Sequence, residues 1–399
     1  MRITVRFMNE IYYDNSATTK VSEKALHAAC RAMREDFGNP SSAHAKGVSA
    51  YHALNEARSV FAGYLNVASD ELYFSSCGTE SNNMIILGAA KAAGKQGKIL
   101  ISAVEHPSVY ESARHLASLG YQVELIPVDR QGIIDMTALE QMLDTHTILV
   151  SIMHVNNETG AIQPLKQAGA LIRAICPQAL FHVDAVQSFG RIPLFLAAWQ
   201  ADAVSMSGHK IHAPKGVGLL WLKKTRNIPA LIWGGGQERG FRSGTENMSG
   251  IMAFTVAAEE CYTQMDQNYA VIVNVRGKFL DDLRKAQVDF HLNGPQDEQA
   301  AAHILNLSFP GIRSEVMLHS LEAKGVYVSA GSACTSMSTK GSRILTAMGL
   351  PSGRIDCALR FSFSRYNTVD EATIAAAAVV DTVLELHGIL NSRKGKKTK

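Results

Sequence analysis

A lysine that could form a covalent bond to a carbonyl compound follows a short apolar run in this sequence. Lys210 ends a Ser-Gly-His-Lys segment that comes directly after apolar residues 203–206. A lysine among small polar groups can form a Schiff base once burial or a nearby cation lowers its pKa. Lys215 is the competing candidate, but it lies in a Pro-Lys-Gly turn, where a lysine is typically solvated. The sequence therefore favours Lys210 as the reactive amine.

A carboxylate occupies the corresponding position after another apolar run. Asp184 follows residues 180–183, and Gln187 lies three residues further on. An unpaired carboxylate is costly to bury, so Asp184 needs a cation or a hydrogen-bond donor. A protonated pyridine nitrogen would serve, and so would an arginine or lysine in a structural salt bridge. The residues alone leave both possibilities open.

Residues 75–83 form a small polar segment that opens directly into a helical pattern. The free N–H groups and the dipole at a helix N-terminus attract anions, so a phosphate would fit there. The alternative is that Thr79 simply caps the helix and no ligand binds.

A cysteine in a run of small polar residues is a candidate nucleophile. Cys334 lies within residues 329–338, which are almost all glycine, alanine, serine or threonine. Structural cysteines are usually buried among apolar groups, whereas reactive cysteines are accessible and have thiolate character. This context favours a reactive thiol at Cys334 on an exposed loop.

The elements that must position these groups alternate between strands and helices. Short β-branched and apolar runs predict seven strands, at residues 71–74, 98–102, 122–127, 147–154, 180–183, 203–206 and 218–221. Helical spacing predicts helices over 80–93, 108–119 and 165–175. This alternation predicts an α/β fold with a mostly parallel seven-stranded sheet covered by helices. Ligands of such sheets bind beyond the carboxyl ends of the strands, where Lys210 and Asp184 are expected.

The chain beyond residue 248 is expected to leave the large domain. A helical pattern without proline spans residues 249–285, and a smaller α+β domain follows. Its expected strands are 303–309, 326–329 and 358–362, and its expected helices are 313–324, 342–348 and 369–387. We predict a large domain over 15–260 and a small domain formed by 1–14 and 261–399. The basic tail 392–399 is expected to be a frayed, solvated terminus; docking to a partner is the alternative.

Composition excludes several classes of function. A net charge of +3 over 399 residues gives no electrostatic footprint for nucleic acid or membrane. The six cysteines have no metal-ligand spacing and no disulfide framework, which predicts reduced thiols, no structural metal and a cytoplasmic protein. The glycines near residue 235 lack the GxGxxG spacing, and no phosphate-binding GxxxxGK[ST] motif occurs. We therefore expect chemistry on a small molecule.

Together these segments resemble a known family. FHVDAVQS at 181–188 and SMSGHK at 205–210 resemble the aspartate and lysine segments of class V, fold type I enzymes that use pyridoxal 5'-phosphate (PLP). In order and spacing the chain is similar to the cysteine desulfurases of the NifS/IscS type. Further matching segments lie at 13–19, 38–42, 78–83, 105–108, 154–160, 242–245, 331–336 and 360–362.

The resemblance implies a role for each matching residue. Lys210 would hold PLP as a Schiff base, Asp184 would pair with the pyridinium nitrogen, and Gln187 would donate to the phenolic oxygen. His106 would stack on the ring and transfer protons, although without the resemblance a core histidine is the better interpretation. The residues implied at the PLP phosphate are Gly78, Thr79, Ser207 and His209, with Thr245 reaching across from the other subunit of a homodimer.

The implied substrate is L-cysteine. Asn39, Asn157 and Arg360 match positions near it, with Asn157 also beside the cofactor. Arg360 is suited to bind a carboxylate through two hydrogen bonds, and a structural salt bridge is its alternative role.

The implied reaction converts L-cysteine to L-alanine. Lys210 would remove the Cα proton, and the Cys334 thiolate would attack the substrate sulfur. The sulfur would remain on Cys334 as a persulfide and pass to an acceptor protein. A free thiol has a pKa of about 8.5, so His106 or a neighbouring cation is expected to assist its deprotonation.

Two alternatives stay open. The same scaffold could act as a selenocysteine lyase or a related PLP lyase. A function of another class would be a docking platform for sulfur acceptors, with catalysis secondary. The chain also departs from the family pattern at residues 337–342 and at Ala213. These departures leave the sulfur acceptor and its pathway undetermined.

Overall fold

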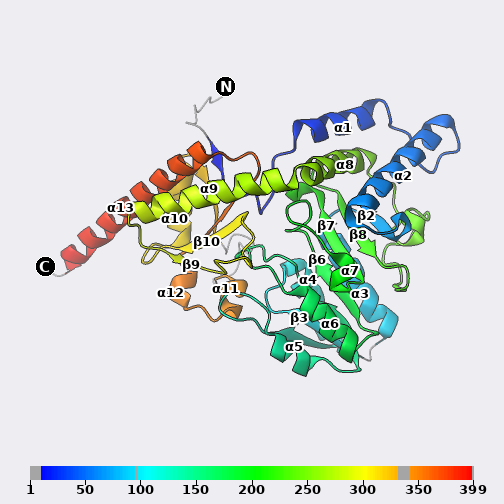
Figure 1. The fold of residues 1–399 in the computed structure, drawn as a ribbon, viewed down its shortest axis with the longest axis horizontal. Coiled ribbons are helices and arrows are strands. Elements are labelled where there is room, and N and C mark those ends of the chain that lie inside the picture. The colour runs from blue at the N-terminus through cyan, green and yellow to red at the C-terminus, as the bar shows by residue number, and fades with distance from the viewer. Residues whose placement is uncertain (1–9, 95–96, 331–340, 398–399) are drawn as a thin grey trace.

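A seven-stranded sheet forms the centre of the larger part of the molecule in the computed structural model, which describes residues 10–94, 97–330 and 341–397 (Figure 1). The strand order is β2-β8-β7-β6-β5-β3-β4, and β8 alone runs antiparallel to its neighbours. The strands are β2 (Leu72–Ser75), β3 (Lys98–Ser102), β4 (Gln122–Ile126), β5 (Thr147–Ser151), β6 (Leu180–Asp184), β7 (Ala203–Ser207) and β8 (Gly218–Leu222). All seven predicted strands are present, and the predicted mostly parallel α/β sheet is confirmed.

Alternating side chains of the strands enter two separate hydrophobic cores. Leu100 of β3 packs in one core, while its neighbours Ile99 and Ile101 pack in the other. The central strands are buried on both faces, which explains their continuous apolar sequences. The edge strand β4 instead exposes Gln122 and Leu125.

Helices cover both faces of this sheet. The first core contains side chains of α2 (Ala45–Leu65), α6 (Leu165–Ile175) and α8 (Met248–Thr263). The second core contains side chains of α3 (Gly78–Ala93) and α4 (Pro107–Ser118). The remaining helices of this part are α1 (Glu23–Arg34), α5 (Met136–Met142), α7 (Leu196–Trp199), η1 (Ser69–Glu71), η2 (Gly208–Lys210) and η3 (Glu238–Gly240).

The single helix predicted over 249–285 is wrong, because the structure has two. Helix α8 ends at Thr263 and α9 (Met265–Lys285) begins two residues later. Gln264 between them has φ −123° and ψ 22°, outside the helical range. Since no proline or glycine marks the junction, the sequence pattern alone could not reveal it. Helix α9 then crosses from the large sheet to the smaller part of the molecule (Figure 1).

The smaller part contains two short sheets. Four antiparallel strands run in the order β12-β13-β10-β9, and β1 pairs in parallel with β11. These strands are β1 (Ile11–Tyr12), β9 (His291–Leu292), β10 (Ile304–Ser308), β11 (Val326–Tyr327), β12 (Ser329–Ala330) and β13 (Ala358–Ser362). The predicted strand 326–329 is therefore divided between two sheets.

Helices α10 (Ser314–Ala323), α11 (Arg343–Ala347), α12 (Ser352–Ile355) and α13 (Val369–Lys397) complete the smaller part. Helix α13 lies along α9 (Figure 1). It continues to Lys397. The expectation of a frayed tail from residue 392 is therefore wrong for residues 392–397, which are helical. Within the described residues no helix combines the length and apolar character needed to cross a bilayer.

Candidate active site

A cavity of about 430 Å³ opens at the carboxyl ends of the parallel strands. Ten residues predicted from the sequence line it, namely Gly78, Thr79, His106, Asn157, Asp184, Gln187, Ser207, His209, Lys210 and Arg360. They come from segments that are distant in sequence and lie mostly at the ends of helices and strands, and the fold brings these segments together. These ten residues therefore lie near the carboxyl ends of the strands, as predicted.

Two predicted residues are described by the structure but do not line this cavity. Asn39 and Thr245 are exposed and do not line it. The side chain of Asn39 accepts a hydrogen bond from the Ser41 backbone N–H instead (2.9 Å). Cys334 lies outside the described residues, although Ser329, five residues before it, lines the cavity.

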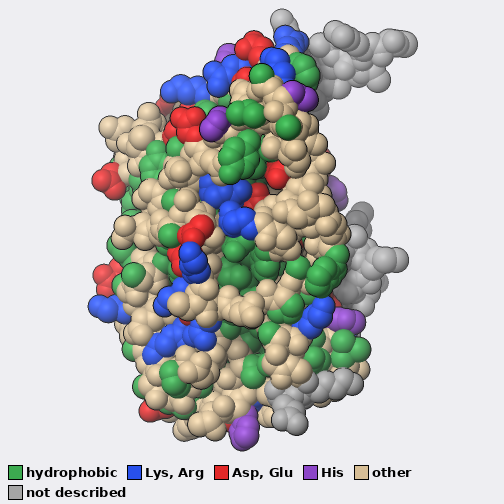
Figure 2. Space-filling view, turned by 90° about the vertical axis from the view of Figure 1, so that its right-hand side faces the viewer, with side chains coloured by type: hydrophobic (Ala, Val, Ile, Leu, Met, Phe, Trp, Pro, Cys, Tyr) green, Lys and Arg blue, Asp and Glu red, His purple; other side chains and the backbone are tan. Residues whose placement is uncertain are grey.

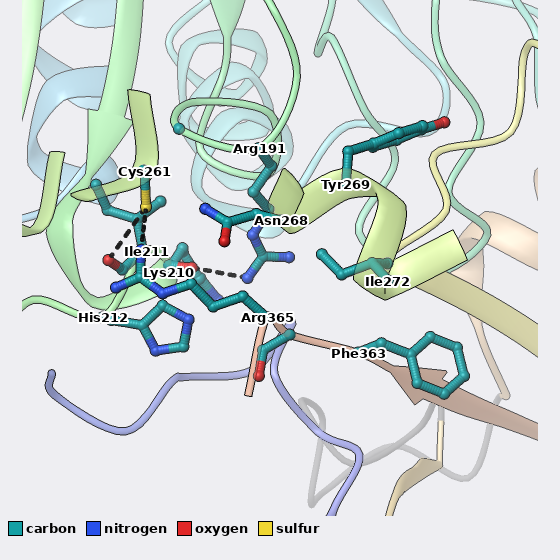
Figure 3. Close-up of a pocket in the computed structure, with 12 residues that line it drawn as sticks. Arg191, Lys210, Ile211, His212, Cys261, Asn268, Tyr269, Ile272, Phe363 and Arg365 are labelled. Atoms are coloured by element: carbon teal, nitrogen blue, oxygen red, sulfur yellow. Dashed lines mark hydrogen bonds between the residues drawn. The ribbon is translucent and has the colours of Figure 1, made fainter. Parts of the chain in front are cut away.

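Lys210 lies in η2, at the end of β7. Its Nζ donates to the backbone oxygens of Ser16 (2.6 Å) and Ala17 (2.9 Å). Arg191 holds the backbone of Lys210, because its Nη2 donates to Lys210 O (2.7 Å) (Figure 3). The same Nη2 also donates to Asn15 O (3.0 Å). The amine is thus fixed at the cavity wall, whereas the competing Lys215 is exposed to solvent.

Asp184 is the last residue of β6 and is buried. Its Oδ2 accepts a hydrogen bond from Asn82 Nδ2 (2.8 Å), and its Oδ1 accepts one from the Val186 backbone N–H (2.9 Å). Each carboxylate oxygen can accept more than one hydrogen bond. Asp184 can therefore still accept a proton-bearing nitrogen from a ligand in the cavity.

His106 is the N-cap of α4 and is linked to Asp184 through two side chains. Its Nδ1 accepts a hydrogen bond from the Ser108 backbone N–H (3.2 Å) and lies 2.8 Å from Ser108 Oγ. Asn82 Nδ2 donates to that same Ser108 Oγ (2.8 Å) as well as to Asp184. Because Nδ1 accepts, the proton of the neutral ring lies on Nε2. Burial lowers the pKa of His106, and the nearby Lys210 lowers it further, although Asp184 opposes them.

Sequence reasoning assigned no role to Asn82, which connects these two residues. It occurs in the segment 78–83 that was noted for its resemblance to the family, and its position in the second turn of α3 gave no sign of the contact. Glu105 was also missed. Its carboxyl group is fully buried, and burial followed by the charge of Asp184 raises its pKa well above the usual value. Glu105 Oε1 accepts from the Met153 backbone N–H (2.6 Å).

The N-terminus of α3 forms one wall of the cavity. Helix α3 begins at Gly78, so the alternative in which Thr79 is the N-cap is wrong; Cys77 is the N-cap and makes no side-chain capping bond. A Cβ on Gly78 would lie 2.5 Å from Val186 Cγ2, so a larger residue would not fit without movement. Ser207 and His209 approach the same region from the end of β7. Burial, followed by the charges of Lys210 and Lys215, lowers the pKa of His209 to about 4.

Arg360 of β13 is buried between the two parts of the molecule. Its Nη1 donates to the backbone oxygen of Asn157 (2.8 Å), and its Nη2 donates to Asp14 Oδ1 (2.8 Å). The structural salt bridge considered as the alternative role of Arg360 is therefore present. The guanidinium nevertheless lines the cavity, and its buried Nε has no partner among the described residues.

Several buried polar atoms around the cavity lack a hydrogen-bond partner among the described residues. They are Asn82 Oδ1, Asn157 Oδ1, Gln187 Oε1, Ser207 Oγ and Arg360 Nε. Buried polar groups in native proteins are almost always satisfied, so a cluster of unsatisfied ones indicates a missing polar ligand or water. The cavity is therefore suited to a ligand with several polar groups.

Comparison with known proteins agrees with this geometry. The family model for aminotransferase class-V matches residues 11–374. A protein named cysteine desulfurase IscS from Methanosarcina thermophila is 38% identical over 380 residues, which cover 95% of this chain and 93% of that protein. A solved structure of a NifS-like protein has a TM-score of 0.89 at 35% identity and covers 95% of this chain and 100% of its own. A structure described as SspA in complex with cysteine has a TM-score of 0.78 at 30% identity, covering 90% of this chain and 100% of its own.

Proposed function

Because this chain belongs to the aminotransferase class-V family, we propose that it is a PLP-dependent cysteine desulfurase. The observation that carries the proposal is that Lys210 and Asp184 line one cavity together with unsatisfied polar atoms. Relatives that match more than nine-tenths of the chain and are named cysteine desulfurases support the choice of reaction.

The cavity residues fit PLP. Lys210 would hold the aldehyde carbon, and Asp184 would accept the proton on the ring nitrogen. The unpartnered Ser207 Oγ, together with Thr79, His209 and the backbone at Gly78, would bind the phosphate at the N-terminus of α3. Gln187 lines the cavity and would form a hydrogen bond with the hydroxyl of the ring. When bound, PLP supplies the electron sink for carbanion chemistry at the substrate Cα.

The substrate residues follow from the same arrangement. Arg360 and Asn157 would bind the carboxylate of L-cysteine as donors, with the unpartnered Arg360 Nε as one available group. The unpartnered Asn157 Oδ1 can only accept, so it would not contact the carboxylate. Binding of the carboxylate would compete with the ion pair to Asp14. Lys210 would then take the Cα proton, and His106 would transfer protons at the substrate sulfur through Nε2.

Cys334 is proposed as the nucleophile. Its thiolate would attack the substrate Sγ, so that an S–S bond forms, the Cβ–Sγ bond breaks, and L-alanine leaves after protonation. Ser329, five residues before Cys334 in the sequence, lines the cavity, which supports this proposal. The persulfide would then pass to a sulfur-acceptor protein.

We further propose that the protein is a homodimer. Large exposed apolar side chains gather around α1, α2 and the loop after β8, including Trp233, which is 76% exposed, and Phe37, which is 65% exposed. Figure 2 views the molecule from the side of α2, where hydrophobic side chains gather among Lys and Arg side chains. An exposed apolar surface of this kind is typical of an interface. The exposed Thr245 and Asn39 would then face the cavity of the partner subunit.

We also propose a division of the chain into two domains and a location in the cell. The division into a large domain (15–260) and a small domain (1–14 and 261–399) is supported by the cores, since one contains Ile11 and Tyr13 together with residues from Ile272 to Val383. A cytoplasmic location is supported by unpaired thiols, which are Cys30, Cys77, Cys176, Cys261 and Cys357 among the described residues.

The test is to record the visible spectrum of the purified protein with and without L-cysteine, and to measure alanine, sulfide and the mass of Cys334. We expect a PLP band, equal amounts of alanine and transferred sulfur, and one added sulfur atom on Cys334. Selenocysteine is assayed beside cysteine to separate the lyase alternative. A protein that contains no PLP and releases no alanine would refute the proposal and would favour the docking platform.

A further inference from the structure

The loop that carries Thr245 is attached firmly to its own subunit. Glu238 and Arg239 have φ values of +47° and +57°, which are unfavourable for residues other than glycine. The Glu238 carboxylate accepts two hydrogen bonds from Arg58 of α2, at 2.8 and 2.9 Å, and both side chains are almost fully buried. It also accepts from the Phe74 backbone N–H (2.9 Å). This buried pair holds the strained turn against β2.

A second ion pair connects the same loop to the turn at the start of α3. Arg242 Nε donates to Glu80 Oε1 (2.6 Å), and Arg242 Nη2 donates to Glu80 Oε2 (3.1 Å). Glu80 Oε2 also accepts from Ser76 Oγ (2.5 Å) and from the Ser76 backbone N–H (3.1 Å). Burial alone would raise the pKa of Glu80, but the hydrogen bonds from Arg242 and Ser76 outweigh it, and the pKa is lowered. The ionised carboxylate thus joins the loop to the turn at 76–79.

The two ends of this connection face different sites. Glu80 directly follows Thr79, which lines the cavity of its own subunit. Arg242 lies three residues before Thr245, which is exposed and does not line that cavity. In the proposed homodimer, Thr245 would contact the PLP phosphate of the partner. The Arg242–Glu80 ion pair would then connect Thr79, a phosphate contact in one active site, with Thr245, a phosphate contact in the other.

We propose that Arg242 and Glu80 are positioning residues that couple PLP retention in the two subunits. This inference rests on the proposed function and dimer. The side chains of this ion pair are only 21% and 15% exposed, so its loss also costs folding stability. The release of PLP is therefore compared among variants that remain folded and dimeric.

The first experiment measures the rate of PLP release from holoenzyme after dilution into an excess of an unrelated PLP-binding apoprotein. We expect Arg242→Met and Glu80→Gln each to accelerate release by about tenfold or more, the effect of losing a hydrogen bond to a charged group. The double variant should release PLP no faster than the faster single variant, because both remove the same interaction. Arg242→Lys, which keeps the charge, should be intermediate.

The matched control is Lys278→Met, which breaks the ion pair with Asp282 on α9, away from the cavity. It should release PLP at the wild-type rate. Unchanged release in Arg242→Met, or equal acceleration in Lys278→Met, would overturn the inference. Circular dichroism and gel filtration of each variant separate loss of folding or of the dimer from loss of the contact.

The second experiment tests the coupling in mixed dimers. One subunit is wild type, and the other carries Lys210→Ala, so that only the wild-type subunit holds PLP covalently. Adding Arg242→Met to the second subunit should accelerate PLP release from the wild-type subunit. If release accelerates only when Arg242→Met is in the PLP-bearing subunit, the coupling is wrong while the proposed function stands. A protein without PLP would instead refute the proposed function itself, and a monomeric protein would refute the proposed homodimer.

Discussion

Asn82 Nδ2 lies 2.8 Å from Asp184 Oδ2 and donates a hydrogen bond to it. The same amide nitrogen lies 2.8 Å from Ser108 Oγ, which contacts His106. One side chain of α3 therefore fixes the carboxylate and, through Ser108, orients the imidazole. This arrangement pre-organises two groups of different chemistry that line the same cavity.

Replacing Asp184 by asparagine should reduce alanine production by about 100-fold or more, because a neutral amide cannot balance the charge of a protonated ring nitrogen. Steady-state kinetics measure the loss, and the visible spectrum reports whether PLP stays bound. Glu111→Gln, which neutralises an exposed carboxylate on α4, should behave as wild type. Wild-type rates in Asp184→Asn would contradict the assigned role.

Removing the amine of Lys210 should abolish covalent PLP binding. Lys210→Ala treated with borohydride should show no PLP fixed to the chain by mass spectrometry, whereas the wild type should carry it on the peptide that contains residue 210. Lys215→Ala is the matched control, since that lysine is exposed five residues away. PLP trapped on any other lysine of the wild type would transfer the role to that residue.

Removing the thiol of Cys334 should separate cofactor binding from sulfur transfer. Cys334→Ala should keep the PLP band, because Cys334 is not among the proposed PLP contacts, and should transfer no sulfur to an acceptor thiol. Cys30→Ala, which removes an exposed cysteine of α1, should keep full activity. The proposal fails for this residue if Cys334→Ala produces alanine and sulfide at the wild-type rate.

Gly78→Ala should weaken PLP binding and destabilise the fold by about 1–3 kcal/mol, the usual cost of overpacking. The added Cβ would lie 2.5 Å from Val186 Cγ2 at the start of α3. Chemical denaturation measures the free energy of unfolding, and titration with PLP measures affinity. Gly63→Ala places the same group on the exposed face of α2, where no atom lies within 4 Å, and should be neutral or stabilising. Equal effects of the two substitutions would exclude the steric explanation.

Buried histidines should make the free energy of unfolding fall in mild acid. Burial lowers the pKa of His182 to about 3, while its ring lies between Ser151 Oγ and Ser205 Oγ at 2.8 and 3.0 Å. Below its usual pKa of 6.5 the unfolded chain binds a proton that the folded chain does not bind until about pH 3. Stability contributed by the neutral ring is therefore present above pH 6.5 and lost progressively as the pH falls toward 3.

His182→Gln isolates this effect from that of other titrating groups. The variant should be less stable at pH 7, but its stability should fall less steeply between pH 6 and 4, by about 1.4 kcal/mol per pH unit. Denaturation at several pH values measures both slopes. Parallel slopes for the two proteins would show that His182 is not responsible. Exposed His146 provides the control, because His146→Gln should leave the slope unchanged.

The strands of the large sheet could be predicted because each contains a short run of apolar or β-branched residues. Lys210 and Asp184 could be predicted because they lie at or just after the ends of such runs. The break between α8 and α9 could not be predicted, since the residue types of Gln264 and its neighbours are compatible with a helix. The contacts of Asn82 and Arg191 depend on how distant segments pack, which local sequence does not encode. His106 was identified only through the resemblance to the family, because a histidine after a strand is not distinctive by itself.

The pairing of Asn15 Nδ2 with Ser362 O joins residues 347 positions apart. Strand β1 likewise pairs with β11, and Ser16 O and Ala17 O are the acceptors of the Lys210 amine. During synthesis the start of the chain leaves the ribosome long before β11 and β13 exist. The large sheet can form earlier, but the pocket wall built from residues 14–17 has to wait for nearly the whole polypeptide. We therefore expect this pocket to be complete only after β11 and β13 have been synthesised.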